Sequence, residues 1–151
     1  NDNHGHQRGD ECLRDIAVMI GKTAIRPTDL ATRYGGEEFA IIMPDTDMAA
    51  ACTVADRLRH AVAEMRIALG EPTDYACVTL SVGVATYVPG QDVVGPEWLI
   101  GQADQALYAA KHLGRNRVVS SESMLLELAK ARLMRSKAAE PAPGAPRKAS
   151  G

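Results

Sequence analysis

The chain has 151 residues, 46% of them hydrophobic, which suits one domain with a hydrophobic core and excludes a wholly disordered protein. The net charge is −2 and is unevenly distributed. Residues 1–126 are acidic, with 11 basic and 17 acidic side chains, whereas residues 127–151 are basic, with six basic and two acidic side chains. The acidic part argues against a general nucleic-acid binder, and no apolar run approaches the roughly 20 residues of a membrane span, so we expect neither partner for this segment.

The first half of the chain predicts a helix followed by a hairpin. Apolar residues recur at helical spacing over residues 9–25, and the proline of RPTD, residues 26–29, ends that pattern. Two short strands are expected over residues 30–34 and 38–43. A glycine pair joins them, and such a pair between apolar runs is a strong hairpin signal.

The second half predicts alternating helices and strands. Helices are expected over residues 47–66 and 95–114, and strands over residues 78–88 and 115–120. The second of these helices has a proline near its start and a glycine at its end, as helices commonly do. The whole order predicts an α/β (α+β) sandwich, with a mostly antiparallel central sheet and helices packed on it.

Three segments of different character follow from these patterns. Residues 1–120 form the expected domain, residues 121–139 a basic and partly helical extension, and residues 140–151 a tail rich in Pro, Ala and Gly that we expect to be disordered. The chain opens on a polar sequence without a signal peptide, and its three cysteines lie in apolar patterns. These features indicate a reducing, cytoplasmic location.

The hairpin carries two carboxylates that neither a turn nor a buried strand requires. Gly35 and Gly36 remove side-chain bulk and leave backbone N–H groups accessible to a large or phosphorylated ligand. Glu37 and Glu38 follow directly and point to opposite faces if strand alternation holds, so that one could hold a divalent cation. A solvated hairpin tip is the alternative interpretation.

Two further segments offer ligand-binding side chains. Lys111 and Arg115 are four residues apart at the end of a helix and can meet an anionic group together. Compensation of the helix dipole is the alternative interpretation. The polar segment NDNHGHQRGD, residues 1–10, can bind a base or a phosphate ahead of a helix.

Together these segments resemble the GGDEF family, the diguanylate cyclases. RYGGEEF, residues 33–39, is similar to the family signature in its GGEEF variant. LSVGVA, residues 80–85, resembles the family's SIGVA strand, and ADQALYAAKHLGRNRV, residues 103–118, resembles its ADxALYxAKxxGRNxV. With Asn, Asp, Gly and His residues of the opening segment, the likeness extends in order over residues 1–119 and is greatest to members linked to response regulators.

The resemblance implies a palm-like, nucleotidyl-cyclase-like fold and a reaction. Two GTP molecules condense into cyclic di-GMP and release two pyrophosphates. Each domain binds one GTP, and two domains face each other in a homodimer. Mg²⁺ or Mn²⁺ and basic side chains neutralise the growing charge. An upstream sensor or receiver domain is also implied.

The resemblance assigns roles to individual residues. Glu37 is the metal ligand and accepts the proton of the 3′-hydroxyl, and Glu38 helps to hold the metal. The substrate-binding positions are Asn1 and Asp10 at the guanine edge, Gly35 and Gly36 beside the nucleotide, and Lys111 and Arg115 at the phosphates.

A regulatory site is implied as well. Arg26 and Asp29 resemble the family's RxxD site, at which the product inhibits its own synthesis. Arginine suits this role because its planar fork reads guanine or phosphate with two hydrogen bonds. Arg57 matches a secondary inhibitory arginine contributed across the dimer. A local salt bridge between Arg26 and Asp29 is the alternative interpretation.

The chain departs from the family pattern at its start. Family members carry a strand of the form DxDxFKxxND, which supplies an aspartate and a carbonyl to the metal and a lysine near the phosphates. This sequence begins at the ND and has no initial Met. We therefore expect an N-terminally truncated fragment that is inactive alone. The rival hypotheses are a degenerate GGDEF domain acting as a non-catalytic receptor for GTP or cyclic di-GMP, and a structural dimerisation domain.

Overall fold

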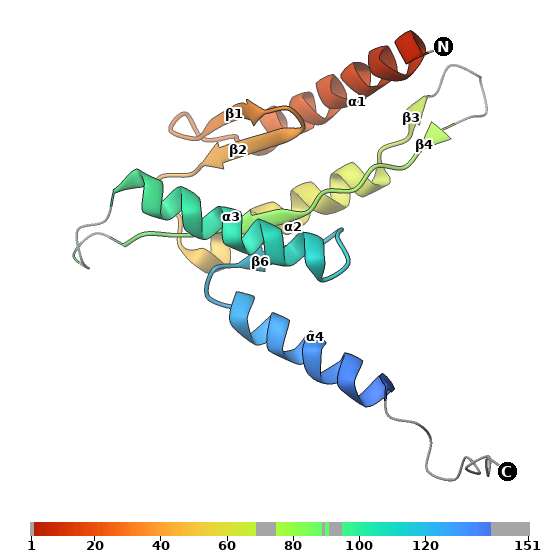
Figure 1. Cartoon of the computed structure of the whole chain (residues 1–151). Helices are drawn as coiled ribbons and strands as arrows, with labels where there is room; N and C mark the ends of the chain where they lie inside the picture. The colour runs from red at the N-terminus through yellow and green to blue at the C-terminus, as the bar shows by residue number, and fades with distance from the viewer. Residues whose placement is uncertain (1, 69–74, 89, 91–94, 140–151) are drawn as a thin grey trace, which may run out of the picture.

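The computed structural model of the protein describes residues 2–68, 75–88, 90 and 95–139, which form four helices and six short strands (Figure 1). In chain order the elements are α1 (Asp2–Thr23), β1 (Leu30–Gly35), β2 (Glu38–Ile42), α2 (Met48–Glu64), β3 (Ile67–Ala68), β4 (Tyr75–Ala76), β5 (Val82–Val84), α3 (Pro96–His112), β6 (Val118–Ser120) and α4 (Met124–Ala139).

The predicted α+β class is confirmed, with smaller sheets than expected. Within the described residues, β1 and β2 form one antiparallel pair, β3 and β4 form another, and β5 and β6 form a parallel pair. These three pairs stand in place of one mostly antiparallel sheet. β3 and β4 were not predicted, because a strand of two residues is too short to display an alternating pattern.

Two element boundaries differ from the prediction for physical reasons. α1 begins at Asp2 and not at residue 9, since its early glycines lower helix propensity without blocking the helix. The strand expected over residues 78–88 is reduced to β5. Val78 and Leu80 pack against the apolar cluster between α1 and α2, but pair with no strand in the described part. Alternation therefore identified inward-facing side chains correctly, whereas a ladder also requires a partner strand.

The largest apolar cluster joins α1, α2 and the hairpin. Ile16 and Ile20 of α1 pack against Leu58 and Val62 of α2, and Phe39 of β2 lies against the same cluster. Figure 1 shows the hairpin lying alongside α1. The hairpin is thus anchored through its apolar side chains, which fixes the place of its tip.

The parallel pair β5–β6 lies between two helices. Side chains of β5 and β6 alternate between the faces, so that one face meets α2 and the other meets α3. The α2 cluster contains Val82, Val84, Val118, Ala51 and Ala55, and the α3 cluster contains Val119, Ala106, Ala109 and Ala110. Alanines on both helices allow close approach to the sheet.

Gly83 permits the closest of these approaches. A Cβ atom on Gly83 would collide with the Ala103 carbonyl oxygen and the Leu107 backbone nitrogen, and would lie 2.9 Å from the Leu107 Cα. The backbone of α3 therefore rests directly on β5. This packing sets the position of the end of α3, where Lys111 lies.

α4 extends away from the rest of the molecule (Figure 1). Met124 and Leu128 pack against the α3 cluster, whereas Leu125, Leu133 and Met134 are exposed. Across the described residues, no helix combines the length and apolar character that crossing a membrane requires. The tail predicted over residues 140–151 lies outside the described residues.

Candidate functional site at the hairpin tip and the end of α3

The hairpin tip is a two-residue turn, Gly36-Glu37. Gly35 is the last residue of β1 and pairs with Glu38, and Gly36 has a φ of +48°. The register shifts between Arg33 and Gly35, which leaves one extra residue on β1 as a bulge. The Arg33 Nε donates a hydrogen bond to the Gly36 carbonyl oxygen at 2.8 Å. The turn therefore lies one residue later than the predicted Gly35-Gly36 joint, because the bulge takes up that residue.

The two glutamates at the tip have different surroundings. Glu37 lies in the turn and outside β2, so the prediction that strand alternation directs the two carboxylates to opposite faces does not apply. Glu38 begins β2, and its Oε1 lies 3.4 Å from the Lys111 Nζ. An exposed ion pair of this kind contributes less than about 1 kcal/mol to stability. Its importance is positional, since it joins the hairpin tip to the last turn of α3.

A left-handed turn follows α3. Its three consecutive residues with positive φ are Gly114 at +115°, Arg115 at +60° and Asn116 at +47°. A non-glycine residue in this region costs on the order of 1–3 kcal/mol, and such strain gathers at functional sites. Because α3 ends at His112, Lys111 lies in its last turn and Arg115 lies just past its end. The Arg115 guanidinium is exposed and forms no hydrogen bond or ion pair within the described part of the chain.

Arg59 of α2 connects to this turn. The side chain of Arg59 is only 15% exposed, and its Nε donates to the Asp56 Oδ1 at 2.9 Å. Its Nη1 donates to the Asn116 Oδ1, also at 2.9 Å. The hydrogen bond from Arg59 holds the pKa of the Asp56 carboxyl below its ordinary value of 3.8. Asp56 therefore stays ionised at neutral pH and holds Arg59 on α2, while Arg59 reaches the turn through the neutral amide of Asn116.

A cavity of about 310 Å³ lies between α1 and the hairpin. The wall of this cavity is apolar at Leu13, Ala17 and Phe39 and carries charged groups at Asp10 and Arg14. Asp10 lies further inside the helix than predicted, because α1 begins at Asp2 and not at residue 9. Its exposed carboxylate beside an apolar wall suits a planar base that carries N–H donors. Asn1, the other residue expected at the base, lies outside the described residues.

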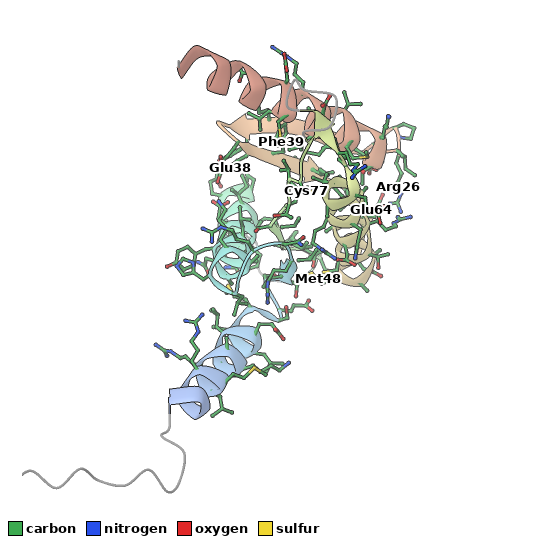
Figure 2. All side chains as sticks on the ribbon, turned by 90° about the vertical axis from the view of Figure 1, so that its right-hand side faces the viewer. Arg26, Glu38, Phe39, Met48, Glu64 and Cys77 are labelled. Atoms are coloured by element: carbon green, nitrogen blue, oxygen red, sulfur yellow. The ribbon has the colours of Figure 1, made fainter. Side chains whose placement is uncertain are left out.

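The RPTD turn, residues 26–29, is held by hydrogen bonds and not by a salt bridge. The Arg26 Nη1 donates to the Thr46 Oγ1 at 3.0 Å, and the Arg26 backbone N–H donates to the Asp29 Oδ2 at 3.1 Å. The Asp29 Oδ1 is buried and has no hydrogen-bond partner among the described residues. No side-chain ion pair joins Arg26 and Asp29 among the described residues, so the alternative of a turn salt bridge is not observed. Figure 2 places Arg26 and Glu38 on opposite sides of the molecule, and Arg57 is exposed on α2.

The carboxylates at the hairpin tip fit part of a metal site. Among the described residues, no group of three or more His, Cys, Asp or Glu side chains is placed to hold a metal ion. Mg²⁺, however, is commonly bound through one or two carboxylates, with substrate phosphates and water as the other ligands. Glu37 and Glu38 carry exposed carboxylate oxygens of that kind, so their chemistry fits a divalent cation.

Four residues near these sites were not identified from the sequence: Arg14, Arg33, Arg59 and Asn116. Arg14 could have been found, because it follows Asp10 by four positions on one helix. The hydrogen bond between Arg59 and Asn116 spans 57 positions, and no local pattern indicates it.

Most of the chain matches one protein family. The family model described as "Diguanylate cyclase, GGDEF domain" matches residues 1–117. The chain belongs to the GGDEF family. The resemblance drawn from the GGEEF motif is thereby confirmed.

Named GGDEF relatives share this similarity. Response regulator PleD of Caulobacter vibrioides is 42% identical over 119 residues, which are 79% of this chain and 26% of PleD. Diguanylate cyclase A of Treponema denticola is 40% identical over 126 residues, which are 83% of this chain and 32% of that protein. The chain thus spans only about a quarter to a third of the length of these relatives.

A solved structure agrees with the fold. The GGDEF domain of DgcB from Caulobacter crescentus, in complex with c-di-GMP, is 38% identical to this chain. The superposition has a TM-score of 0.73 and covers 82% of this chain and 70% of that one. The described arrangement of helices and strands is therefore that of a GGDEF domain.

Proposed function

We propose that this chain is the catalytic domain of a diguanylate cyclase, which condenses two GTP molecules into cyclic di-GMP and two pyrophosphates. The observation that carries the proposal is the 3.4 Å approach of Lys111 to Glu38. It joins two parts of the family motif that lie 73 positions apart. A carboxylate assigned to the metal thus lies beside a cation assigned to the phosphates.

The substrate is held in two places under this proposal. The guanine enters the cavity between α1 and the hairpin, where Asp10 accepts its two N–H groups. Adenine offers no such pair of donors, and a site built to bind them rejects a base that lacks them. The phosphates lie across the hairpin tip, where a Cβ on Gly35 or Gly36 would meet nothing within 4 Å. Lys111 and Arg115 hold their negative charge.

The chemical step is a phosphoryl-type transfer between two bound nucleotides. The 3′-oxygen of each GTP forms a bond to the α-phosphorus of the other, and in both transfers the bond from that phosphorus to the pyrophosphate oxygen breaks, so that two bonds form and two pyrophosphates leave. Glu37, at the exposed turn, accepts the 3′-hydroxyl proton. Glu37 and Glu38 would hold Mg²⁺ or Mn²⁺, and the bound cation would neutralise charge on the leaving group.

Two copies of the domain are required by this chemistry. Each domain holds one GTP, so a homodimer brings the 3′-hydroxyl of one against the α-phosphate of the other. The similarity to a response regulator favours an upstream sensor or receiver domain that controls the approach of the two domains.

Product inhibition is the second part of the proposal. The Asp29 Oδ1, buried without a hydrogen-bond partner in the part of the chain that the structure describes, is an acceptor that a guanine N–H satisfies once the turn opens to admit the ligand. The Arg26 guanidinium, which now contacts Thr46, is exposed and can turn to a phosphate or a base edge. Arg57 of a second copy completes this cyclic di-GMP site.

The test is the identity and stoichiometry of the products. The full-length protein, incubated with GTP and Mg²⁺, should release two pyrophosphates for each cyclic di-GMP formed. Pyrophosphate release without cyclic di-GMP would contradict the proposed reaction. Binding of GTP or cyclic di-GMP without any turnover would instead support a receptor.

A further inference from the structure

The turn that carries Arg115 is held in place from α2. Arg59 reaches Asn116, the residue directly after Arg115, through a 2.9 Å hydrogen bond to its side-chain oxygen. Arg59 is itself fixed at its other end by Asp56, one turn earlier on α2. By contrast, Arg57, two positions before Arg59, is exposed. Arg59, whose side chain is only 15% exposed, is thus partly buried where it connects to the turn.

The backbone of Arg115 is fixed on both sides. Its N–H donates to the Ala110 carbonyl oxygen at 3.0 Å, and its own carbonyl oxygen accepts from the Arg117 Nε at 3.3 Å. Both Arg115 and Asn116 have positive φ, which arginine adopts rarely and asparagine more readily. A backbone held in an unfavoured conformation needs support from its surroundings, and the hydrogen bond from Arg59 to Asn116 is such support.

The guanidinium of Arg115 contrasts with its backbone. It is exposed and makes no hydrogen bond or ion pair within the part of the chain that the structure describes. A fixed backbone with an available cation is the arrangement expected of a group prepared for an anionic ligand, because less ordering is needed when the ligand binds.

We infer that Arg59 is a positioning residue, which holds the left-handed turn through Asn116 and so presents the Arg115 guanidinium to a nucleotide phosphate. This inference rests on the proposed role of Arg115 in holding GTP. Arginine is required at position 59 because its planar fork reaches Asp56 and Asn116 at once, whereas the single ammonium group of lysine lacks that geometry.

The test is a double-mutant cycle on nucleotide affinity. The probe is 3′-deoxy-GTP with Mg²⁺, which lacks the attacking hydroxyl and therefore binds without being consumed. In the full-length protein, Arg115→Ala should weaken binding by about ten- to a hundred-fold, the loss expected for a charged hydrogen bond. Arg59→Lys should weaken it on the order of ten-fold through misplacement of Arg115. The double variant should bind as Arg115→Ala does.

The cycle separates positioning from a general structural effect. Additive losses in the double variant would show that Arg59 does not act through Arg115 and would overturn the inference. Arg132→Lys, an exposed change on α4, is the matched control and should leave affinity unchanged. If Arg115→Ala alone binds as wild type does, the proposed phosphate contact is wrong, and this inference falls with it.

A second variant keeps the test decisive if Arg59→Lys does not fold. Asn116→Gly retains a residue that adopts positive φ without strain and removes only the acceptor for Arg59. Asn116→Gly should weaken 3′-deoxy-GTP binding when Arg115 is present. When it is combined with Arg115→Ala, it should cause no further loss of affinity. Unchanged affinity in Asn116→Gly alone would overturn the inference.

Discussion

Replacement of Gly83 by alanine should destabilise the domain by forcing α3 away from β5. The added Cβ would collide with the Ala103 carbonyl oxygen and the Leu107 nitrogen, and it would lie 2.9 Å from the Leu107 Cα. All three atoms belong to helix backbone, which cannot move aside as the end of a flexible side chain can. Ordinary contact therefore requires α3 to retreat by roughly 1 Å, against a core packed to near-crystalline density.

The magnitude follows from the cost of overpacking. Extra methyl groups in a packed core cost typically about 1–3 kcal/mol, and a clash with helix backbone belongs at the upper end. For a chain of this size, about 3 kcal/mol corresponds to a fall in Tm of roughly 6–12 °C. Lys111 lies one helical turn after Leu107, so the displacement should also loosen its pairing with Glu38.

Thermal unfolding followed by circular dichroism measures this effect. Gly101→Ala is the matched control, because Gly101 lies in the same helix and a Cβ there meets nothing within 4 Å. Alanine is preferred to glycine inside a helix by about 1 kcal/mol, so this control should raise the Tm slightly. A Gly83→Ala variant as stable as wild type would refute the close packing of α3 on β5.

Three further predictions concern the core, the base and the product site. Val62→Ala should lower the unfolding free energy by about 1.5–3 kcal/mol in urea denaturation, because Val62 is fully buried; a loss below about 0.5 kcal/mol would contradict its place in the core. Asp10→Ala should weaken GTP binding by about ten-fold or more and leave ATP binding unchanged, since only guanine has two N–H donors for the carboxylate; equal losses for both nucleotides in calorimetry would exclude base recognition. Arg26→Ala should leave the initial rate with GTP unchanged and raise the half-inhibitory concentration of cyclic di-GMP by roughly ten- to a hundred-fold. Identical inhibition curves for wild type and variant would show that Arg26 only stabilises the turn and does not bind the product.

The sequence predicted the helices well because their apolar spacing reports directly on packing. Both ends of α2 and both ends of α3 lie within two residues of their expected positions. The buried stripe of α2 includes Ala51, Ala55, Leu58 and Val62. The strands were less predictable. Val78 and Leu80 face inward as the alternation indicated, yet whether they join a ladder depends on a partner that the local pattern does not contain.

The site was predicted residue by residue, but its geometry was not. The motif pointed to Glu38 and Lys111 separately, and the structure brings them together at 3.4 Å. The left-handed turn at Arg115 and Asn116 has no signal beyond the preceding glycine, because asparagine and arginine occupy many conformations. Arg59 could not be identified at all, since its partner Asn116 is distant in the sequence and meets it only after α2 and α3 pack on the same sheet.

The central claim is that the exposed glutamate of the hairpin turn carries out the condensation of GTP. It is tested most directly by the rate of cyclic di-GMP formation in the full-length protein with the substitution Glu37→Ala, at saturating GTP and Mg²⁺. The matched control is Glu64→Ala, an exposed glutamate at the end of α2. Glu37→Ala should reduce the rate by about a hundred-fold or more with the Tm unchanged, as expected when a general base and metal ligand is lost, while Glu64→Ala should retain the wild-type rate. A Glu37→Ala protein that forms cyclic di-GMP at a rate similar to wild type would contradict the account.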